Sequence, residues 1–175
     1  ILIIVNKGQL NQFKKILPEK NNLGISIEYR EQSKPAGLPQ AFTIGEKFIG
    51  KDNVALILGD NFFYAQSLTK ILKKNINLKS GAKIFIHPVK NPQLYGVATL
   101  GKNKKVLKLI EKPKKTKSNL AVTGLYFFDN NVVEMTKKLK PSSRNELEII
   151  DLLNNYKKKN KLKAEFIGRG GSWLD

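Results

Sequence analysis

The sequence predicts an α/β fold in which helices pack on a mixed sheet. The first observation is the apolar run from Val54 to Leu58, which is typical of a strand buried on both faces in the middle of such a sheet. The second is that strand and helix patterns alternate in the early part of the chain. The third is that several strand patterns follow one another between residues 82 and 128, which favours a mixed sheet over a purely parallel one.

The first half of the chain is expected to alternate strands and helices. Strands are predicted where short runs are apolar or alternate between apolar and polar residues, and helices where the apolar period is longer. Pro18 ends the first helix, and Pro39 suits the first turn of the second, because proline lacks the N–H that a helix interior needs. Residues 30–38 are expected to form a loop. In order, the expected elements are strand Ile1–Val5, helix Gln9–Leu17, strand Ile25–Tyr29, helix Pro39–Phe48, strand Val54–Leu58 and helix Ser67–Leu78.

The second half begins with consecutive strands. Residues 101–104 predict a turn between two of them. Ser143 with Glu146 matches a capping box, which predicts a helix start. In order, the expected elements are strands Ala82–Val89, Tyr95–Leu100, Val106–Ile110 and Ala121–Phe128, helix Asn131–Leu139, a helix from Ser143 to Tyr156 and strand Leu162–Ile167.

Composition excludes several kinds of site. The chain has no cysteine, which excludes disulfides and zinc–cysteine sites, and its single histidine, His87, excludes a histidine-rich metal site. The sequence contains no signal-peptide pattern and no membrane-spanning run. We therefore expect a cytoplasmic protein that does not bind membranes. Because no linker or repeat is evident, we expect a single domain over residues 1–175, cut through structure at both ends.

The formal net charge of +18 suggests nucleic-acid binding, but the kind of basic residue argues against it. Of the 32 basic residues only Arg30, Arg144 and Arg169 are arginine, and base readout favours arginine over lysine. We interpret the lysines as a solvated basic surface and expect no nucleic-acid partner. Such a surface still attracts anionic substrates such as nucleotides and sugar phosphates.

Asp60 is the first candidate functional residue. It comes directly after the Val54–Leu58 run and Gly59, and a carboxylate is costly inside an apolar layer, so it should lie beyond the strand's C-terminal end. In open α/β sheets that edge is where ligands bind, and an aspartate there can hold a divalent cation on a phosphate. The alternative is a turn aspartate that caps the next helix, and Asp60 alone leaves both open.

Two further segments have patterns that suit a ligand. Residues 32–41 form a Pro/Gly loop that leads into a helix start, where free backbone N–H groups approach an anion or a base edge, and Gln32 offers a donor and an acceptor on one amide. Gly96, within a strand, marks either a close approach of the backbone to a ligand or a bulge. The alternative for the loop is an ordinary connection.

The last two segments are charged. Glu111 can accept hydrogen bonds from sugar hydroxyls and Lys112 can act as a point charge on a phosphate, although a solvated ion pair explains both equally. Because neighbouring side chains of a strand point to opposite faces, both reach one ligand only if the backbone twists at this place. Asp175, which follows Trp173 and Leu174, is a second candidate metal carboxylate.

Taken together and in order, the motifs resemble the glucose-1-phosphate thymidylyltransferase family. The resemblance covers essentially the whole chain and rests on residues 32–41, 58–61, 95–97, 111–113, 118–127, 146–149 and 173–175. It implies a Rossmann-like nucleotidyltransferase fold, incomplete here, with a mixed, mostly parallel sheet and helices on both faces. The implied reaction joins dTTP to glucose 1-phosphate and gives dTDP-glucose and pyrophosphate, in dTDP-rhamnose and polysaccharide biosynthesis. It also implies a homo-oligomer, a tetramer in the family.

The resemblance also implies roles on the nucleotide side. Gln32 and Gly37 would contact the thymine and its nucleoside, and Asn61 would lie beside the nucleotide sugar. Asp60 and Asp175 would hold Mg²⁺ and act as catalytic residues.

On the sugar side, the resemblance implies that Gly96 and Val122 line the glucose pocket through their backbone, together with Glu111. Lys112 would bind the sugar phosphate as a catalytic residue, and the aromatic walls would be Tyr95 and Trp173.

The chain departs from the family in two respects. The first is that the family's C-terminal helical part, beyond the motif at residues 173–175, is missing. The second concerns the start of the family's sequence. The glycine-rich loop L-A-G-G-x-G-T-R-L, which cradles the triphosphate, does not occur in the 175 residues. We therefore expect the parent protein to be an enzyme and the chain alone to be inactive. The alternatives are a sugar-1-phosphate nucleotidylyltransferase that uses UTP or CTP, and a non-catalytic nucleotide-sugar-binding regulatory subunit.

Overall fold

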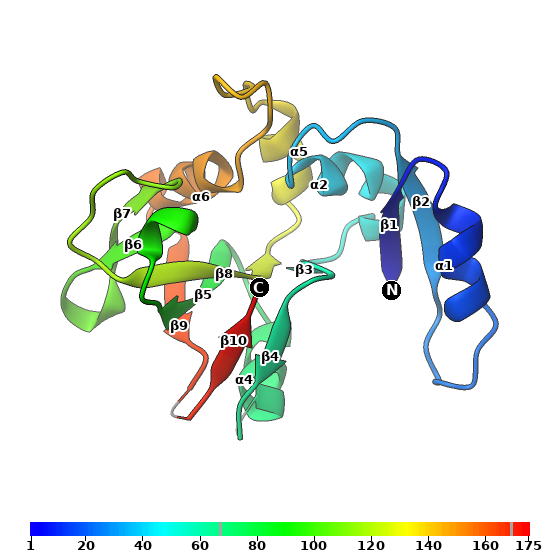
Figure 1. Cartoon of the computed structure of the whole chain (residues 1–175), viewed down its shortest axis with the longest axis horizontal. Helices are drawn as coiled ribbons and strands as arrows, with labels where there is room; N and C mark the ends of the chain where they lie inside the picture. The colour runs from blue at the N-terminus through cyan, green and yellow to red at the C-terminus, as the bar shows by residue number, and fades with distance from the viewer. Residues whose placement is uncertain (67, 169) are drawn as a thin grey trace.

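A computed structural model describes residues 1–66, 68–168 and 170–175. A sheet of six strands forms its centre, in the order β7-β6-β8-β5-β9, with β3 paired to β8 (Figure 1). The strands of this sheet are β3 (Val54–Ile57), β5 (Ala82–Pro88), β6 (Val97–Leu100), β7 (Val106–Ile110), β8 (Leu120–Phe128) and β9 (Leu162–Phe166).

Strand β8 organises the sheet because it pairs along both edges. Along one edge it pairs with β5. Along the other it pairs first with β6, at Leu120 and Ala121, and then with β3, from Leu125 to Phe128. The stretch between these pairings, residues 122–124, is where β8 changes partner. It is held there by hydrogen bonds of 2.7 Å from the Val122 N–H to the Gly96 carbonyl and 2.9 Å from the Leu58 N–H to the Gly124 carbonyl.

The expectation of a mixed α/β sheet is confirmed, but that of a mostly parallel one is wrong for the described strands. Strand β8 runs antiparallel to β3, β5 and β6, and β6 runs antiparallel to β7. The pairing of β5 with β9 is parallel. A short turn joins β6 to β7, and a connection that short makes an antiparallel hairpin.

Helices cover both faces of the sheet, as expected (Figure 1). One face packs against α2 (Gln40–Ile44), α3 (Glu46–Ile49), α5 (Val132–Lys137) and α6 (Ile149–Lys158). The other packs against α4 (Leu68–Ile76) and a two-stranded ribbon of β4 (Phe62–Tyr64) and β10 (Ser172–Leu174). Because β8 alternates its side chains between the two faces, it contributes to both cores, with Phe128 in one and Phe127 in the other.

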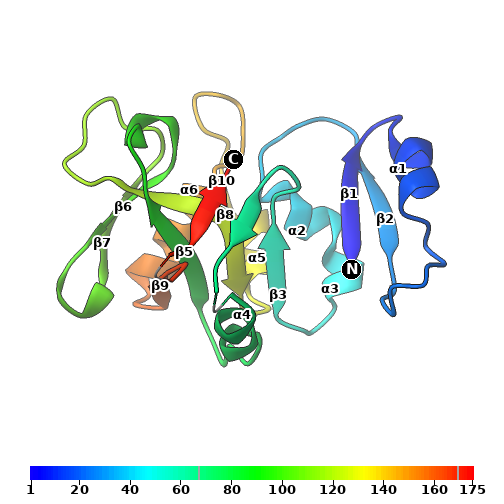
Figure 2. The ribbon, with the colours of Figure 1, turned by 60° about the horizontal axis from the view of Figure 1, so that its bottom comes forward.

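The N-terminal residues form a smaller unit beside the sheet. Strands β1 (Leu2–Asn6) and β2 (Glu28–Gln32) pair in parallel, with α1 (Leu10–Ile16) between them in sequence. Tyr29 is buried, and its hydroxyl donates a hydrogen bond to the Leu17 carbonyl at the end of α1. Figure 2 shows β1 and β3 side by side. A cavity of about 640 Å³ lies between them, bordered by residues 1–4 and 56–59.

Most expected elements are present, with shifted ends. The strand expected at Ile25–Tyr29 is β2, which begins later, at Glu28. The helix expected from Pro39 to Phe48 is divided at Gly45 into α2 and α3, as the poor helix propensity of glycine favours. The expected start of α4 at Ser67 lies outside the described residues. Short 3₁₀ turns cover Pro92–Leu94 and Lys102–Lys104.

Strand β3 is not buried on both faces, so that expectation is wrong. Val54 and Leu56 pack against the core, whereas the Ile57 side chain is 57% exposed. The apolar run therefore records one buried face and one face that borders the cavity towards β1.

The capping box expected at Ser143 and Glu146 is also wrong, because α6 begins only at Ile149. Residues 142–148 form a turned segment instead, held by hydrogen bonds of 2.8 Å from the Ser142 N–H to the Glu146 carbonyl and from the Leu147 N–H to the Ala36 carbonyl. Asn145 has a φ of +59°, which a helix does not admit. Among the described residues, no helix has the length and apolar character that a membrane span requires.

Candidate active site

The candidate site is a cavity of about 270 Å³ at the place where β8 changes partner. Most of the side chains that the sequence singled out border it, although they come from five separate parts of the fold. These residues are Gly37, Tyr95, Gly96, Glu111, Lys112, Val122, Trp173 and Asp175. The cavity shares Gly37, Leu38, Leu58 and Glu146 with the larger cavity between β1 and β3, so the two adjoin.

Asp60 and Asn61 lie in the turn between β3 and β4, beyond the end of β3 as expected. The pairing of β4 with β10 brings the C-terminal residues to this turn, with Leu174 opposite Phe62. The Asn61 amide nitrogen then donates hydrogen bonds to both carboxylates, 2.9 Å to Asp60 Oδ1 and 2.6 Å to Asp175 Oδ1. The two expected metal carboxylates are therefore neighbours, although they lie at distant positions in the chain.

Glu111 and Lys112 both border the cavity, which the simple alternation of a strand would not allow. The backbone turns at Lys112, whose φ of +38° is in the left-handed region, and its N–H donates to the Tyr95 carbonyl at 3.1 Å. Burial, and then the negative charge of Glu148, raises the pKa of Glu111 above its ordinary value, against the opposing effect of Arg144 and Lys112. The backbone therefore twists at Lys112, as both side chains require in order to reach one ligand.

Gly96 lies where β6 meets β8, and a side chain would not fit there. A β-carbon at Gly96 would lie 2.7 Å from Ile150 Cδ1 and 3.3 Å from Glu111 Oε2. The Gly96 carbonyl accepts a hydrogen bond from the Val122 N–H at 2.7 Å, so these two backbone groups bind each other. The Val122 N–H is therefore not available to a sugar, whereas the Gly96 carbonyl keeps a second acceptor position.

Gln32 ends β2 and borders the larger cavity, and Gly37, in the loop that follows, borders both cavities. Gln32 donates from Nε2 to Gln40 Oε1 at 2.7 Å, which fixes its amide at the start of α2. Gly37 has a φ of +98°, and its α-carbon lies directly against the backbone of Leu147. Glycine is thus required here for packing, whatever it contacts in addition.

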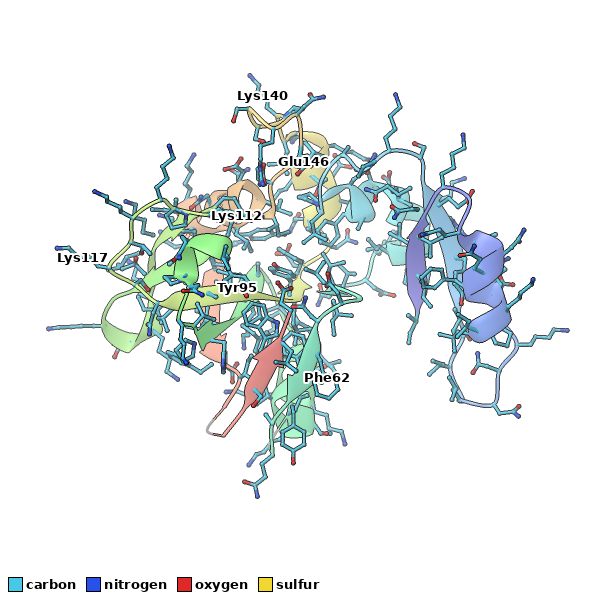
Figure 3. All side chains as sticks on the ribbon, viewed as in Figure 1. Phe62, Tyr95, Lys112, Lys117, Lys140 and Glu146 are labelled. Atoms are coloured by element: carbon cyan, nitrogen blue, oxygen red, sulfur yellow. The ribbon has the colours of Figure 1, made fainter. Side chains whose placement is uncertain are left out.

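Trp173 and Tyr95 both border the cavity, with their rings in contact. Their ring centroids are 5.1 Å apart in an edge-to-face arrangement, and Trp173 is buried. Figure 3 labels Tyr95, just before β6, and Lys112, just after β7, and shows Lys117 and Lys140 at the outer surface.

The profile of the nucleotidyl transferase family matches residues 1–175. The chain belongs to the nucleotidyl transferase family. Among its relatives, the glucose-1-phosphate thymidylyltransferase of Neisseria meningitidis is 49% identical over all 175 residues, which cover 61% of that protein. The one from Mycobacterium tuberculosis strain H37Rv is 45% identical over the whole chain, which covers 60% of it. The chain thus spans about 60% of the length of these relatives.

Solved structures agree with this membership. A Bacillus anthracis protein assigned as a glucose-1-phosphate thymidylyltransferase and crystallised with a sucrose has a TM-score of 0.89 and 38% identity, covering all of this chain and 70% of its own. A UDP-glucose pyrophosphorylase with UDP-glucose has a TM-score of 0.80 at 23% identity, covering 99% of this chain and 74% of its own. At 23% identity, the similarity to the UDP-glucose pyrophosphorylase shows a shared fold alone.

Tyr126, Arg144 and Glu148 also border the candidate cavity, and the sequence analysis gave none of them a role in a site. Arg144 donates to Glu148 at 3.1 and 2.7 Å and lies 3.6 Å from Glu111 Oε1. Burial alone would raise the pKa of Glu148, but hydrogen bonds from Arg144 and Ser142 outweigh it and hold the pKa below its ordinary value. The four-residue spacing of Arg144 and Glu148 could have predicted this ion pair. The interpretation of Ser143 and Glu146 as a capping box drew attention away from it.

The donor set of the candidate site fits Mg²⁺. This ion commonly takes one or two carboxylates and completes its shell with phosphate oxygens and water. Asp60 and Asp175 supply two exposed carboxylates held close together. Within the described ranges, no cluster of three or more His, Cys, Asp or Glu side chains forms a closed metal site. An open pair of this kind leaves the remaining coordination positions to water and phosphate oxygens.

Proposed function

We propose that the protein to which this chain belongs transfers a thymidylyl group from dTTP to glucose 1-phosphate, giving dTDP-glucose and pyrophosphate. The observation that carries the proposal is the convergence of Glu111, Lys112 and Asp175 on one cavity. Two carboxylates and an ammonium group border this single space, and they suit sugar hydroxyls, a metal ion and a phosphate respectively. The relatives in Neisseria and Mycobacterium support the choice of substrates.

On the sugar side, Lys112 neutralises the 1-phosphate and Glu111 accepts hydrogen bonds from the glucose hydroxyls. Lys112 is exposed and its backbone is fixed by the bond to Tyr95, so its ammonium group is free to reach a phosphate. Arg144 borders the same cavity and adds a second cation near the sugar phosphate. The raised pKa of Glu111 reflects a partly buried carboxylate, which a sugar hydroxyl would stabilise by donating to it.

In the proposed reaction, an oxygen of the sugar phosphate attacks the α-phosphorus of the nucleotide in line, and pyrophosphate leaves on the opposite side. The chain contributes alignment and charge neutralisation, with little covalent work. Asp60 and Asp175 would hold Mg²⁺, which supplies positive charge to the phosphate oxygens when bound. Gln32 and Gly37 would contact the base from the loop at the junction of the cavities.

The proposal includes a homo-oligomer. The ribbon of β4 and β10 exposes Phe62, Tyr64 and Leu174 by 60%, 66% and 63%, and a cluster of exposed apolar side chains favours contact with another chain. Figure 3 shows Phe62 on this ribbon.

The test is a chimera in which these 175 residues replace the segment that they match in the Neisseria meningitidis relative. We expect pyrophosphate release that depends on dTTP and glucose 1-phosphate, with weaker release from UTP or CTP. The chimera with Lys112→Met is the matched control. A folded chimera that prefers UTP or CTP, or that releases no pyrophosphate while the unmodified relative does, would contradict the proposal.

The chain by itself is expected to release no pyrophosphate at rates typical of enzymes, about 1 per second or more. The glycine-rich triphosphate loop is absent from its 175 residues, and loss of even one preorganised donor costs roughly 10²–10³ in rate. Turnover by the isolated chain would show that this loop is dispensable.

A further inference from the structure

We infer that Asn61 is a positioning residue that holds Asp60, Asp175 and Trp173 in one arrangement, and thereby sets the affinity of the two carboxylates for a divalent cation. The inference rests on the proposed function, because it assumes that the carboxylates bind the metal. It differs from the role that the family resemblance implied, in which Asn61 lies beside the nucleotide sugar.

The hydrogen bonds of the Asn61 amide carry the first argument. Its nitrogen donates to Asp60 Oδ1 at 2.9 Å and to Asp175 Oδ1 at 2.6 Å. Its oxygen accepts from the Gly124 N–H at 2.9 Å and from Trp173 Nε1 at 2.6 Å. An asparagine amide has two N–H donors and two acceptor positions, so all four are used within the protein.

The pattern of partners fixes which way the amide points. The side bearing the N–H groups faces acceptors only, and the carbonyl side faces donors only. An aspartate at position 61 would present an acceptor to two other carboxylates, and leucine, of similar size, would form none of the four bonds. The site is therefore specific for an amide in this orientation.

Strand β8 makes room for this amide, which is an independent observation. A β-carbon at Gly124 would lie 2.4 Å from Asn61 Oδ1 and 2.7 Å from Asn61 Cγ. Gly124 therefore lets the side chain of Asn61 approach the strand closely. The bond between Leu58 and Gly124 holds the start of the same turn against β8.

The physical role follows from the charges. Asp60 and Asp175 are both exposed and carry like charges, so without a bound cation they repel each other. Two N–H groups of one amide offset that repulsion and keep both carboxylates near a single point. Groups that orient metal-binding carboxylates commonly change metal affinity by about 10–100-fold when they are removed.

The test uses the chain as it is, because Trp173 is its single tryptophan and lies beside the site. Tb³⁺ is the probe, since its emission is sensitised by a nearby excited tryptophan, and Mg²⁺ is the competitor. The variants are Asn61→Leu and Gly124→Ala, and far-UV circular dichroism verifies that each is folded. The matched control is Asn53→Leu, an exposed asparagine at the other end of β3 that hydrogen-bonds the Leu78 carbonyl.

We expect Asn61→Leu and Gly124→Ala each to raise the Tb³⁺ dissociation constant at least ~10-fold, and Asn53→Leu to leave it unchanged. Asn61→Leu should also change the Trp173 emission of the metal-free chain, because the indole loses its hydrogen-bond partner. If Asn61→Leu fails to fold, the Tb³⁺ dissociation constant of Gly124→Ala tests the inference. This substitution displaces the Asn61 amide without changing its chemistry.

Two results would overturn the inference, and they differ in what else they overturn. Wild-type affinity and unchanged Trp173 emission in the folded variants would remove the role of Asn61 and leave the metal assignment intact. Absence of sensitised, Mg²⁺-sensitive emission in the wild-type chain would remove the metal assignment of the proposed function, and the role of Asn61 with it.

Discussion

Gly37 and Leu147 are in direct backbone contact, and this contact joins the two halves of the candidate site. A β-carbon at Gly37 would lie 2.1 Å from the Leu147 carbonyl oxygen. The hydrogen bond from the Leu147 N–H to the Ala36 carbonyl is part of the same contact. The loop expected to bind the base is thereby attached to the segment that carries Arg144 and Glu148 beside the candidate cavity.

Gly37→Ala is therefore predicted to destabilise the chain more than an ordinary glycine substitution. The left-handed φ of +98° costs about 1–2 kcal/mol for alanine. The clash with backbone adds about 1–3 kcal/mol, because the segment must move. The control is Gly8→Ala, at a similar φ of +85° but with nothing within 4 Å of its β-carbon. Urea denaturation measures both, and equal losses would mean that the contact with Leu147 contributes nothing.

Glu111 and Lys112 are predicted to do separate work on the sugar phosphate. In the active chimera, Glu111→Gln should reduce discrimination against deoxyglucose 1-phosphates more than it changes the affinity for dTTP, because a polar group left unpaired is what rejects an analogue. Lys112→Met should raise KM for every sugar phosphate alike. Steady-state kinetics with glucose 1-phosphate and its deoxy analogues measures both effects. If neither parameter changed, the two residues would be a solvated pair worth roughly 0–1 kcal/mol.

The raised pKa of Glu111 predicts a pH dependence of stability. Its pKa in the folded chain lies above the ordinary value of 4.5, so the folded state binds a proton more tightly than the unfolded state. The contribution of Glu111 to stability therefore falls as the pH rises from the unfolded pKa through the folded one, and is regained on acidification. The free energy of unfolding is measured for wild type and Glu111→Gln from neutral to acidic pH. As the pH falls, the wild type should gain stability relative to the variant. A difference independent of pH would contradict the raised pKa.

Asp60→Asn and Asp175→Asn are each predicted to abolish most turnover of the chimera without unfolding it. Both carboxylates are exposed, Asp60 in the turn after β3 and Asp175 directly after β10. An amide of the same size fits at either position but carries no charge for Mg²⁺. Asp52→Asn, an exposed aspartate before β3, is the control and should retain activity. Near-parental turnover of either site variant across a magnesium titration would require the paired-metal assignment to be dropped.

Local patterns in the sequence were sufficient to predict most elements and most of the site. The apolar runs of β3 and β8 predicted both strands from a few neighbouring residues, and β8 is buried at every position from Ala121 to Phe128. The order of motifs along the chain indicated the family. Glu111, Lys112 and Gly96 border one cavity, and its occupation by a sugar stays a prediction.

The sequence did not determine which distant segments meet. Strands β4 and β10 have only three residues each, too few for a periodic pattern, yet their pairing brings Asp175 to Asn61. The segment at residues 142–148 has the local pattern of a helix start, but its backbone bonds to Ala36, and a long-range hydrogen bond outweighed local propensity. By itself the sequence determined the α/β class and the candidate residues. Only the tertiary structure decided that the two aspartates share one asparagine, because that contact depends on strand register and on the space that Gly124 leaves beside β8.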